Sequence, residues 1–130
     1  MKPETENWLK IARYDLKAAK TCLQNELYLK VFENCHTALE KVIKGIITEN
    51  QEKEPPKIHN LLKLCSLAIV EELTTEIQKI FHELNNIYYL TRYPKDFDYL
   101  EKILSKDKTE DIYTRTEKVF KWLEGKLKGD

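Results

Sequence analysis

The chain has 130 residues, of which 42% are hydrophobic and 34% are charged. This length suits one domain, and this balance excludes both a membrane-embedded chain and a disordered one. Lys plus Arg and Asp plus Glu both number 22, and the zero net charge argues against a strongly basic nucleic-acid-binding protein or a polybasic membrane anchor.

Residues that break regular structure are few, because the chain has only three Gly and four Pro. This scarcity argues against a turn-rich β-sandwich or barrel. No apolar run is long enough to cross a membrane, and the polar N-terminus does not resemble a secretory signal. Cys22, Cys35 and Cys65 lack the spacing of a zinc site or a disulfide framework, so we expect reduced thiols in a cytoplasmic protein without a metal.

The first half of the chain predicts two long helices packed as an antiparallel hairpin. Pro3 suits a first helical turn, and residues 24–26 form a short polar break after this helix. The second helix is predicted to run from residue 27 to about Thr48. The apolar positions of the first helix follow steps of three and four: Trp8, Ile11, Ala12, Leu16, Ala19 and Leu23.

The second predicted helix has a broad apolar surface, which exceeds the narrow stripe that one core needs. We therefore expect a homodimer that uses part of this surface. The residues concerned are Tyr28, Val31, Phe32, Val42, Ile43, Ile46 and Ile47. The charges of the segment Glu40–Lys44, which interrupt this surface, are interpreted as the solvated face of the helix.

Residues 49–57 are predicted to form a loop, because they are polar and include two adjacent prolines. A shorter helix follows, with Asn60 or His59 as its N-cap. Its apolar positions are Leu61, Leu62, Leu64, Cys65, Ala68 and Ile69.

The last part of the chain predicts two longer helices joined by a weaker segment. A capping box at Thr75–Gln78 places a helix start near residue 75, and Pro94 is expected to end this helix by about Tyr93. Residues 95–108 predict only a turn or two of helix. A second capping box at Asp107–Glu110 predicts the start of the last helix, so the whole chain, residues 1–130, is expected to form one all-α, up-and-down antiparallel bundle of four to five helices.

The candidate binding residues gather around one of only three arginines. Tyr88, Arg92 and Tyr93 lie at a helix end, where an arginine offers a planar fork for phosphate and tyrosines offer stacking faces and hydroxyls. In the alternative interpretation, Tyr88 packs in the bundle while Arg92 bonds terminal carbonyls of the helix or pairs with a surface acid. Burial of Arg92 against an acid would favour that alternative, whereas exposed aromatic rings and a basic cluster would favour binding.

Several segments, taken in order, resemble a HEPN domain. They include Trp8, Ala12, Asp15 and Leu16, then Ala38–Lys44, then His59-Asn60-Leu61 after Pro-Pro-Lys, and finally Tyr88 with Arg92-Tyr93-Pro94. The resemblance implies a helical bundle that is commonly dimeric. It also implies a minimal nucleotidyltransferase as partner, because small prokaryotic members are often encoded beside one, in pairs that resemble toxin–antitoxin systems.

Many HEPN proteins are ribonucleases in which four to six residues separate an Arg from a following His, and this chain departs from that motif. After Arg92 the corresponding positions hold Phe97, Asp98 and Tyr99. The chain is therefore predicted to have no catalytic residues and no cofactor, and to bind a nucleotide or RNA through Arg92, Tyr93, Tyr88 and His59, as the resemblance to the Arg-Tyr-Pro members implies.

Two alternatives stay open at this point. One is a ribonuclease toxin in which His59 or His82 is brought near Arg92 by folding or dimerisation and replaces the missing base. The other is a structural module that serves only for dimerisation.

Overall fold

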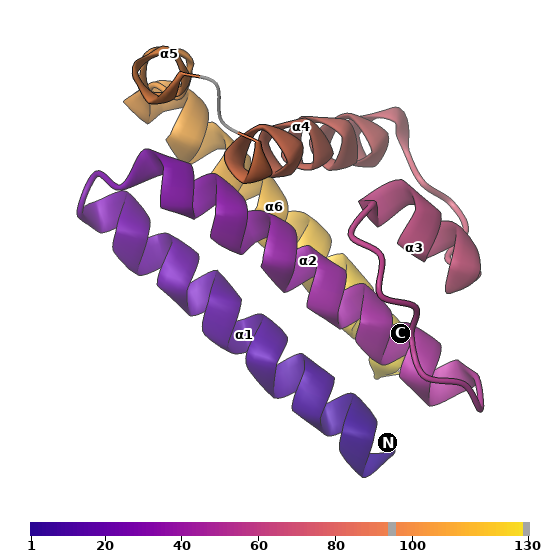
Figure 1. Cartoon of the computed structure of the whole chain (residues 1–130). Coiled ribbons are helices and arrows are strands. Elements are labelled where there is room, and N and C mark those ends of the chain that lie inside the picture. The colour runs from indigo at the N-terminus through magenta and orange to yellow at the C-terminus, as the bar shows by residue number, and fades with distance from the viewer. Residues whose placement is uncertain (94–95, 129–130) are drawn as a thin grey trace.

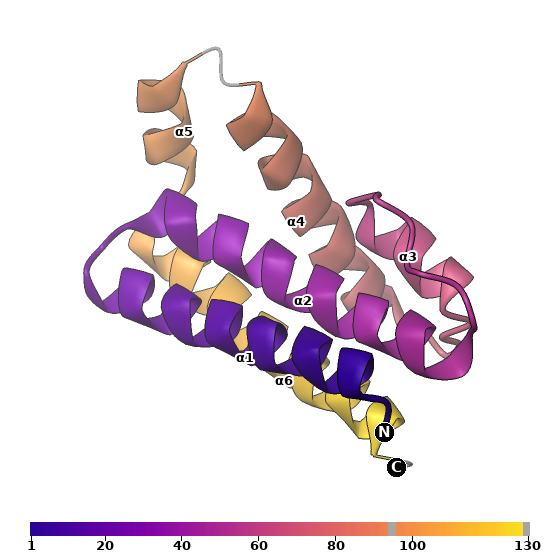
Figure 2. The same cartoon turned by 60° about the horizontal axis from the view of Figure 1, so that its bottom comes forward.

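The computed structural model describes residues 1–93 and 96–128, which form six helices (Figure 1). The helices are α1 (Pro3–Gln24), α2 (Tyr28–Asn50), α3 (Leu61–Leu67), α4 (Thr75–Arg92), α5 (Phe97–Ile103) and α6 (Lys106–Leu127). Successive long helices α1, α2, α4 and α6 run in alternating directions, and α4 is inclined across α2 (Figures 1 and 2). The predicted all-α, up-and-down bundle is confirmed, with the seven-residue helices α3 and α5 between its long helices.

Helix α2 is the central element, because it packs against each of the other five helices. Its wide apolar surface is therefore buried within the chain: Val31, Val42 and Ile43 are completely covered, and Ile46 and Ile47 are almost so. This burial corrects the sequence argument that the surface is left over for a second copy. The homodimer itself stays a prediction.

The α1–α2 hairpin is closed by a short turn and by close contact between the helices. Glu26 has φ 60°, and the Leu27 N–H donates to the Cys22 carbonyl at 2.9 Å. At the other end, a Cβ added to Gly45 would lie 3.3 Å from the Trp8 Cβ. The absence of a side chain at position 45 therefore allows α1 and α2 to approach closely at this point.

The starts of α4 and α6 lie close to their predicted places, but different residues cap them. Thr74, not Thr75, is the N-cap of α4 and accepts from the Ile77 N–H at 3.2 Å. Ser105, not Asp107, caps α6 and accepts from the Lys108 N–H. Helix α4 ends at Arg92, as predicted, while Pro94 lies outside the described residues.

Two predicted apolar positions do not reach the core. Ile11 on α1 is 45% exposed, and the neighbouring Leu9 is buried in its place. Ile69 lies beyond the end of α3, has φ 55° and is largely exposed. Helix α3 ends before Ile69, so this residue no longer shares the helical face of Leu61 and Leu64.

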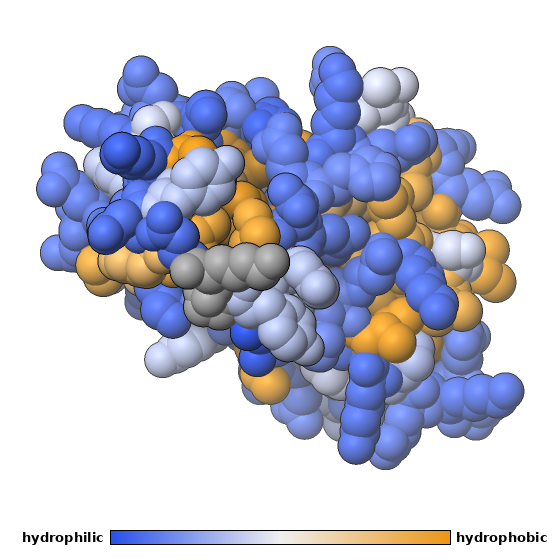
Figure 3. Space-filling view, turned by 45° about the horizontal axis from the view of Figure 1, so that its top comes forward, coloured by the Kyte–Doolittle hydropathy of each residue, from blue (hydrophilic) through white to orange (hydrophobic). Residues whose placement is uncertain are grey.

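The surface of the bundle carries both hydrophilic and hydrophobic side chains. On the face shown in Figure 3, hydrophilic side chains surround separate hydrophobic areas. No helix in the described part of the chain is long and apolar enough to span a membrane.

Cys35 and Cys65 are buried free thiols. Burial raises the pKa of each thiol to about 12, which suits the predicted role of small apolar side chains.

Candidate functional site

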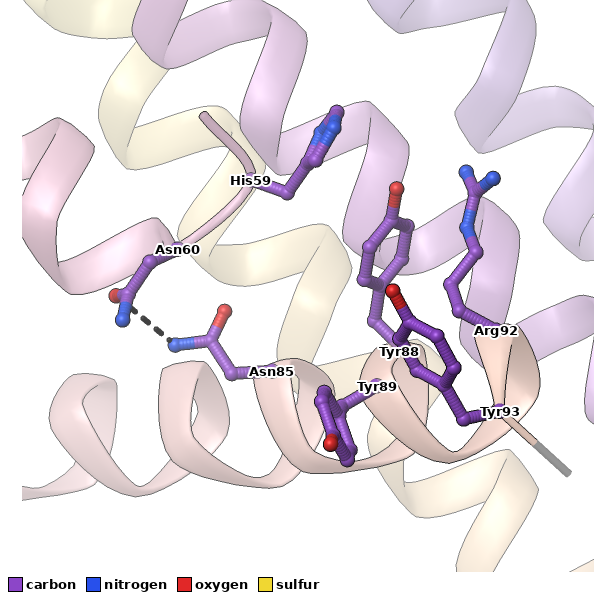
Figure 4. A pocket seen from close by; sticks show the side chains of 7 residues that line it. All are labelled: His59, Asn60, Asn85, Tyr88, Tyr89, Arg92 and Tyr93. Carbon is purple, nitrogen blue, oxygen red and sulfur yellow. Dashed lines mark hydrogen bonds between the residues drawn. The ribbon is translucent and has the colours of Figure 1, made fainter. Parts of the chain in front are cut away.

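A cavity of about 570 Å³ lies between the C-terminal half of α4 and the segment that leads into α3 (Figure 4). Helix α4 contributes four of the lining residues, its C-cap residue contributes a fifth, and the approach to α3 contributes two. The lining residues are His59, Asn60, Asn85, Tyr88, Tyr89, Arg92 and Tyr93. The cavity thus contains all four of the predicted binding residues.

The helical repeat of α4 explains why its residues meet at this cavity. Asn85, Tyr88 and Arg92 follow one another at steps of three and four, so they lie on the same side of the helix. Tyr89 and Tyr93 are one helical turn apart, and their rings are 5.2 Å apart in a tilted arrangement. Both rings are well exposed, with 62% of Tyr89 and 66% of Tyr93 accessible.

Two asparagines attach the approach to α3 to helix α4. Asn60 is the predicted N-cap of α3, and its Oδ1 accepts from the Lys63 N–H at 3.1 Å. Asn85 Oδ1 accepts from the Leu61 N–H at 3.0 Å, and Asn85 Nδ2 donates to Asn60 Oδ1 at 3.2 Å (Figure 4). These bonds fix the position of His59, the residue directly before the cap.

Tyr88 is the centre of the site, since three side chains surround its ring. His36 of α2 stacks on the ring at 4.1 Å with an interplanar angle of 19°, and His59 lies at 5.2 Å. The Arg92 guanidinium carbon is 4.6 Å from the ring centre, within the range of a cation–π contact. Burial raises the pKa of the Tyr88 hydroxyl, and the Arg92 charge opposes this shift, so Tyr88 is a neutral hydrogen-bond donor at pH 7.

Beneath the cavity, Glu40 of α2 connects the site to a buried charge pair. Glu40 Oε1 lies 3.0 Å from His59 Nδ1, and Glu40 Oε2 lies 3.0 Å from Lys44 Nζ. Glu40 is only 6% exposed and Lys44 only 7%. The interpretation of this segment as a solvated face is therefore wrong for Glu40 and Lys44, because α2 is covered on several sides by other helices.

The carboxylate of Glu40 determines the tautomer of His59. A carboxylate only accepts hydrogen bonds, so His59 Nδ1 carries a hydrogen and donates it to Glu40. The second ring nitrogen, Nε2, remains available to a ligand, because the His59 side chain is 53% exposed.

His36 is the least expected member of the site. Its side chain is fully buried, and its Nε2–H donates to the His59 carbonyl at 2.8 Å while its ring stacks on Tyr88. Its Nδ1 has no hydrogen-bond partner within residues 1–93 and 96–128. Burial lowers the pKa of His36 to about 4, so the ring is neutral at pH 7 and holds both Tyr88 and the His59 backbone in place.

Of the residues that the sequence analysis named as binding or catalytic candidates, the structure places four at the cavity and one outside it. His59, Tyr88, Arg92 and Tyr93 line one cavity, whereas His82 is exposed on α4 and does not line it. Sequence reasoning missed four others that shape the site, namely His36, Glu40, Asn85 and Tyr89. The four-residue spacing of His36, Glu40 and Lys44 places them on one helical face, and this was a signal for the buried network.

The site has the chemistry to bind an anion that carries a flat ring. Arg92 is exposed, and no acid in the described ranges 1–93 and 96–128 forms an ion pair with it. Its guanidinium can bind phosphate in a bidentate manner, and the exposed tyrosine rings can stack on a base. In the same described ranges, no group of three or more His, Cys, Asp or Glu residues is arranged to hold a metal ion.

The comparison with protein families gives one match. A family model described as HEPN domain matches residues 5–126 of the chain. Searches of curated proteins and of solved structures give no match. The match spans all six helices except the first two residues of α1 and the last of α6, and it supports a role connected with nucleotides or RNA.

Proposed function

The chain belongs to the HEPN domain family, and from this premise we propose that it is a binding subunit that acts with a minimal nucleotidyltransferase. The cavity beside Arg92 binds a nucleotide or polynucleotide, and the chain forms a homodimer in the cytoplasm as one half of a toxin–antitoxin pair. The resemblance to small prokaryotic members supports the partner, the dimer and the pairing.

One observation carries the binding role. Arg92 is an exposed arginine that lines a cavity beside Tyr88 and Tyr93, and within the described residues no acid pairs with it. A structural arginine would be expected to pair with an acid or to be buried. Arg92 contacts the phosphate in this proposal, while the rings of Tyr93 and Tyr88 contact the base and His59 lines the same cavity.

Arg92 variants test this role through binding and stability together. Titration of the full chain with AMP and with a short single-stranded RNA should show that Arg92→Ala costs about 1.5–3 kcal/mol in binding, the range of a charge-assisted hydrogen bond. Its free energy of unfolding should fall by no more than about 1 kcal/mol, the size of an exposed cation–π contact. Arg92→Lys should recover only part of the binding, because lysine keeps the charge but lacks the planar fork.

Arg13→Ala is the matched control. Arg13 is also exposed, but it pairs with Glu124 outside the cavity, so its loss should leave binding unchanged. Binding that is equal in the wild type and in Arg92→Ala would contradict the proposed site. A large loss of stability with unchanged binding per folded molecule would show that Arg92 is a scaffold residue.

A second candidate function is a ribonuclease with a displaced histidine. The observation that favours it is the position of His59, which shares the cavity with Arg92 and is oriented by Glu40. Metal-independent RNA cleavage needs a base for the 2′-hydroxyl proton, and His59 Nε2 has the required lone pair. The binding proposal predicts negligible cleavage of single-stranded RNA. Cleavage that is lost in both Arg92→Ala and His59→Asn would establish the second function instead.

A further inference from the structure

We propose that the cavity recognises a terminal phosphate monoester, the doubly charged end group of a nucleotide or of a phosphorylated RNA, and that His59 takes up a proton when this group binds. This inference rests on the proposed function, because it uses the same cavity. It specifies the ligand end group and the protonation state in which that group is bound.

Three groups of different kinds point to this ligand: the Arg92 guanidinium and the Tyr88 hydroxyl are hydrogen-bond donors, and His59 becomes a donor at Nε2 when it is protonated. The guanidinium of Arg92 and the imidazole of His59 lie on either side of the Tyr88 hydroxyl in the view of Figure 4. Both lie close to the Tyr88 ring, at 4.6 Å and 5.2 Å from its centre. A phosphate monoester has three terminal oxygens that accept hydrogen bonds, whereas a phosphodiester within a strand has only two. The three donors therefore match the monoester.

The charges of the site lead to the same conclusion. The charge of Glu40 is already balanced by Lys44, whose Nζ lies 3.0 Å away. Arg92 supplies one positive charge at the cavity, and a protonated His59 supplies a second. Together they match the double negative charge that a monoester carries above its second pKa of about 6. A diester carries one charge and would leave the second cation unmatched.

The groups around His59 explain why a ligand would bring a proton with it. Glu40 and His36 face it from α2, and Tyr88 and Arg92 face it from α4. Of these, Glu40 is the group in hydrogen-bond contact with the imidazole, and its charge is balanced by Lys44, while His36 and Tyr88 are neutral at pH 7. A bound dianion adds a negative charge within a few ångströms of His59, and such a charge favours the protonated form of an imidazole.

The test compares end groups on one RNA sequence. The full-length protein is titrated with a single-stranded tetranucleotide that carries a 5′-phosphate, a 3′-phosphate or hydroxyls at both ends, and with AMP and inorganic phosphate. We expect a phosphate-ended RNA to bind at least about tenfold more tightly than the hydroxyl-ended one, because the hydroxyl-ended RNA lacks at least one charge-assisted hydrogen bond. The terminal phosphate that gives the tighter binding, 5′ or 3′, shows which end of the RNA the cavity recognises.

Proton uptake is measured by calorimetry at pH 7.5, where the monoester is already doubly charged. The observed heat should depend on the ionisation heat of the buffer in the wild type. His59→Asn and His59→Gln keep a neutral donor toward Glu40, and both should abolish proton uptake and most of the end-group preference. His82→Asn is the matched control, since His82 is an exposed histidine outside the cavity, and it should behave as the wild type.

The outcomes separate this inference from the proposed function. Equal binding of hydroxyl-ended and phosphate-ended RNA, weakened by Arg92→Ala, would contradict the inference and leave the proposed function in place. Inorganic phosphate that binds as tightly as AMP, with proton uptake through His59, would support the inference and contradict nucleotide recognition. Tight binding of a phosphate-ended RNA without proton uptake would refute the role of His59.

Discussion

The replacement of Lys44 by methionine tests whether the charge pair beneath the cavity is buried in solution. Lys44 and Glu40 lie one turn apart on α2, and their side chains are 9% and 8% exposed. Methionine is close in length to lysine and is tolerated in helices and in cores, so Lys44→Met chiefly removes the charge. Within the described residues, Glu40 then keeps its hydrogen bond with His59, at 3.0 Å, and a longer contact of 3.7 Å with the neutral His36 ring.

The expected cost follows from leaving one buried charge without its main partner. Breaking a buried ion pair in this way costs about 3–5 kcal/mol, and the remaining contact with His59 places the expected value near 3 kcal/mol. Lys30→Met is the matched control, because Lys30 pairs with Glu33 three residues away but is 61% exposed. The loss of such a surface pair should cost less than about 0.5 kcal/mol.

Urea denaturation followed by circular dichroism gives both free energies of unfolding. The double variant Glu40→Gln/Lys44→Met should recover most of the loss, because it leaves no unpaired charge in the interior. A cost for Lys44→Met as small as that of Lys30→Met would refute the reasoning. It would mean that Lys44 is solvated, as the charge pattern of the sequence alone suggested.

Three further predictions concern pH, capping and assembly. Burial lowers the pKa of His36 to about 4, so between about pH 6.5 and pH 4 the unfolded chain binds a proton that the folded chain does not. The free energy of unfolding should therefore fall by about 3 kcal/mol as the pH drops through this range. Urea denaturation at several pH values should show this fall, and a smaller one in His36→Asn. Thr74→Ala should cost about 1 kcal/mol, because Thr74 caps α4, whereas Thr75→Ala should cost little; equal effects would contradict the assigned cap. Sedimentation equilibrium at micromolar concentration should show a homodimer, and a single 15.5 kDa species would exclude one.

Much of the helical architecture is determined locally and could be predicted from the sequence. The spacing of apolar residues defines α1 and α2, because a helix must bury one side, and the predicted capping boxes place the starts of α4 and α6 close to their actual positions. Residues that interrupt a helix are also local signals: the polar break at residues 24–26 and the proline at position 94 both lie where a helix ends. Arg92, Tyr88 and Tyr93 could be named as candidates because one short segment contains them all.

The tertiary structure decided which polar residues become buried. A charge pattern shows that Glu40 and Lys44 share a helical face, but it does not show whether another part of the chain will cover that face. In this bundle α2 is central, and the approach to α3 crosses it at His59, so the charges are enclosed and Glu40 becomes the partner of His59. The sequence places His36 on the same helical face, but its burial depends on the tertiary structure for the same reason. Its stacking on Tyr88 joins residues 52 positions apart, and only the packing of α4 on α2 brings them into contact.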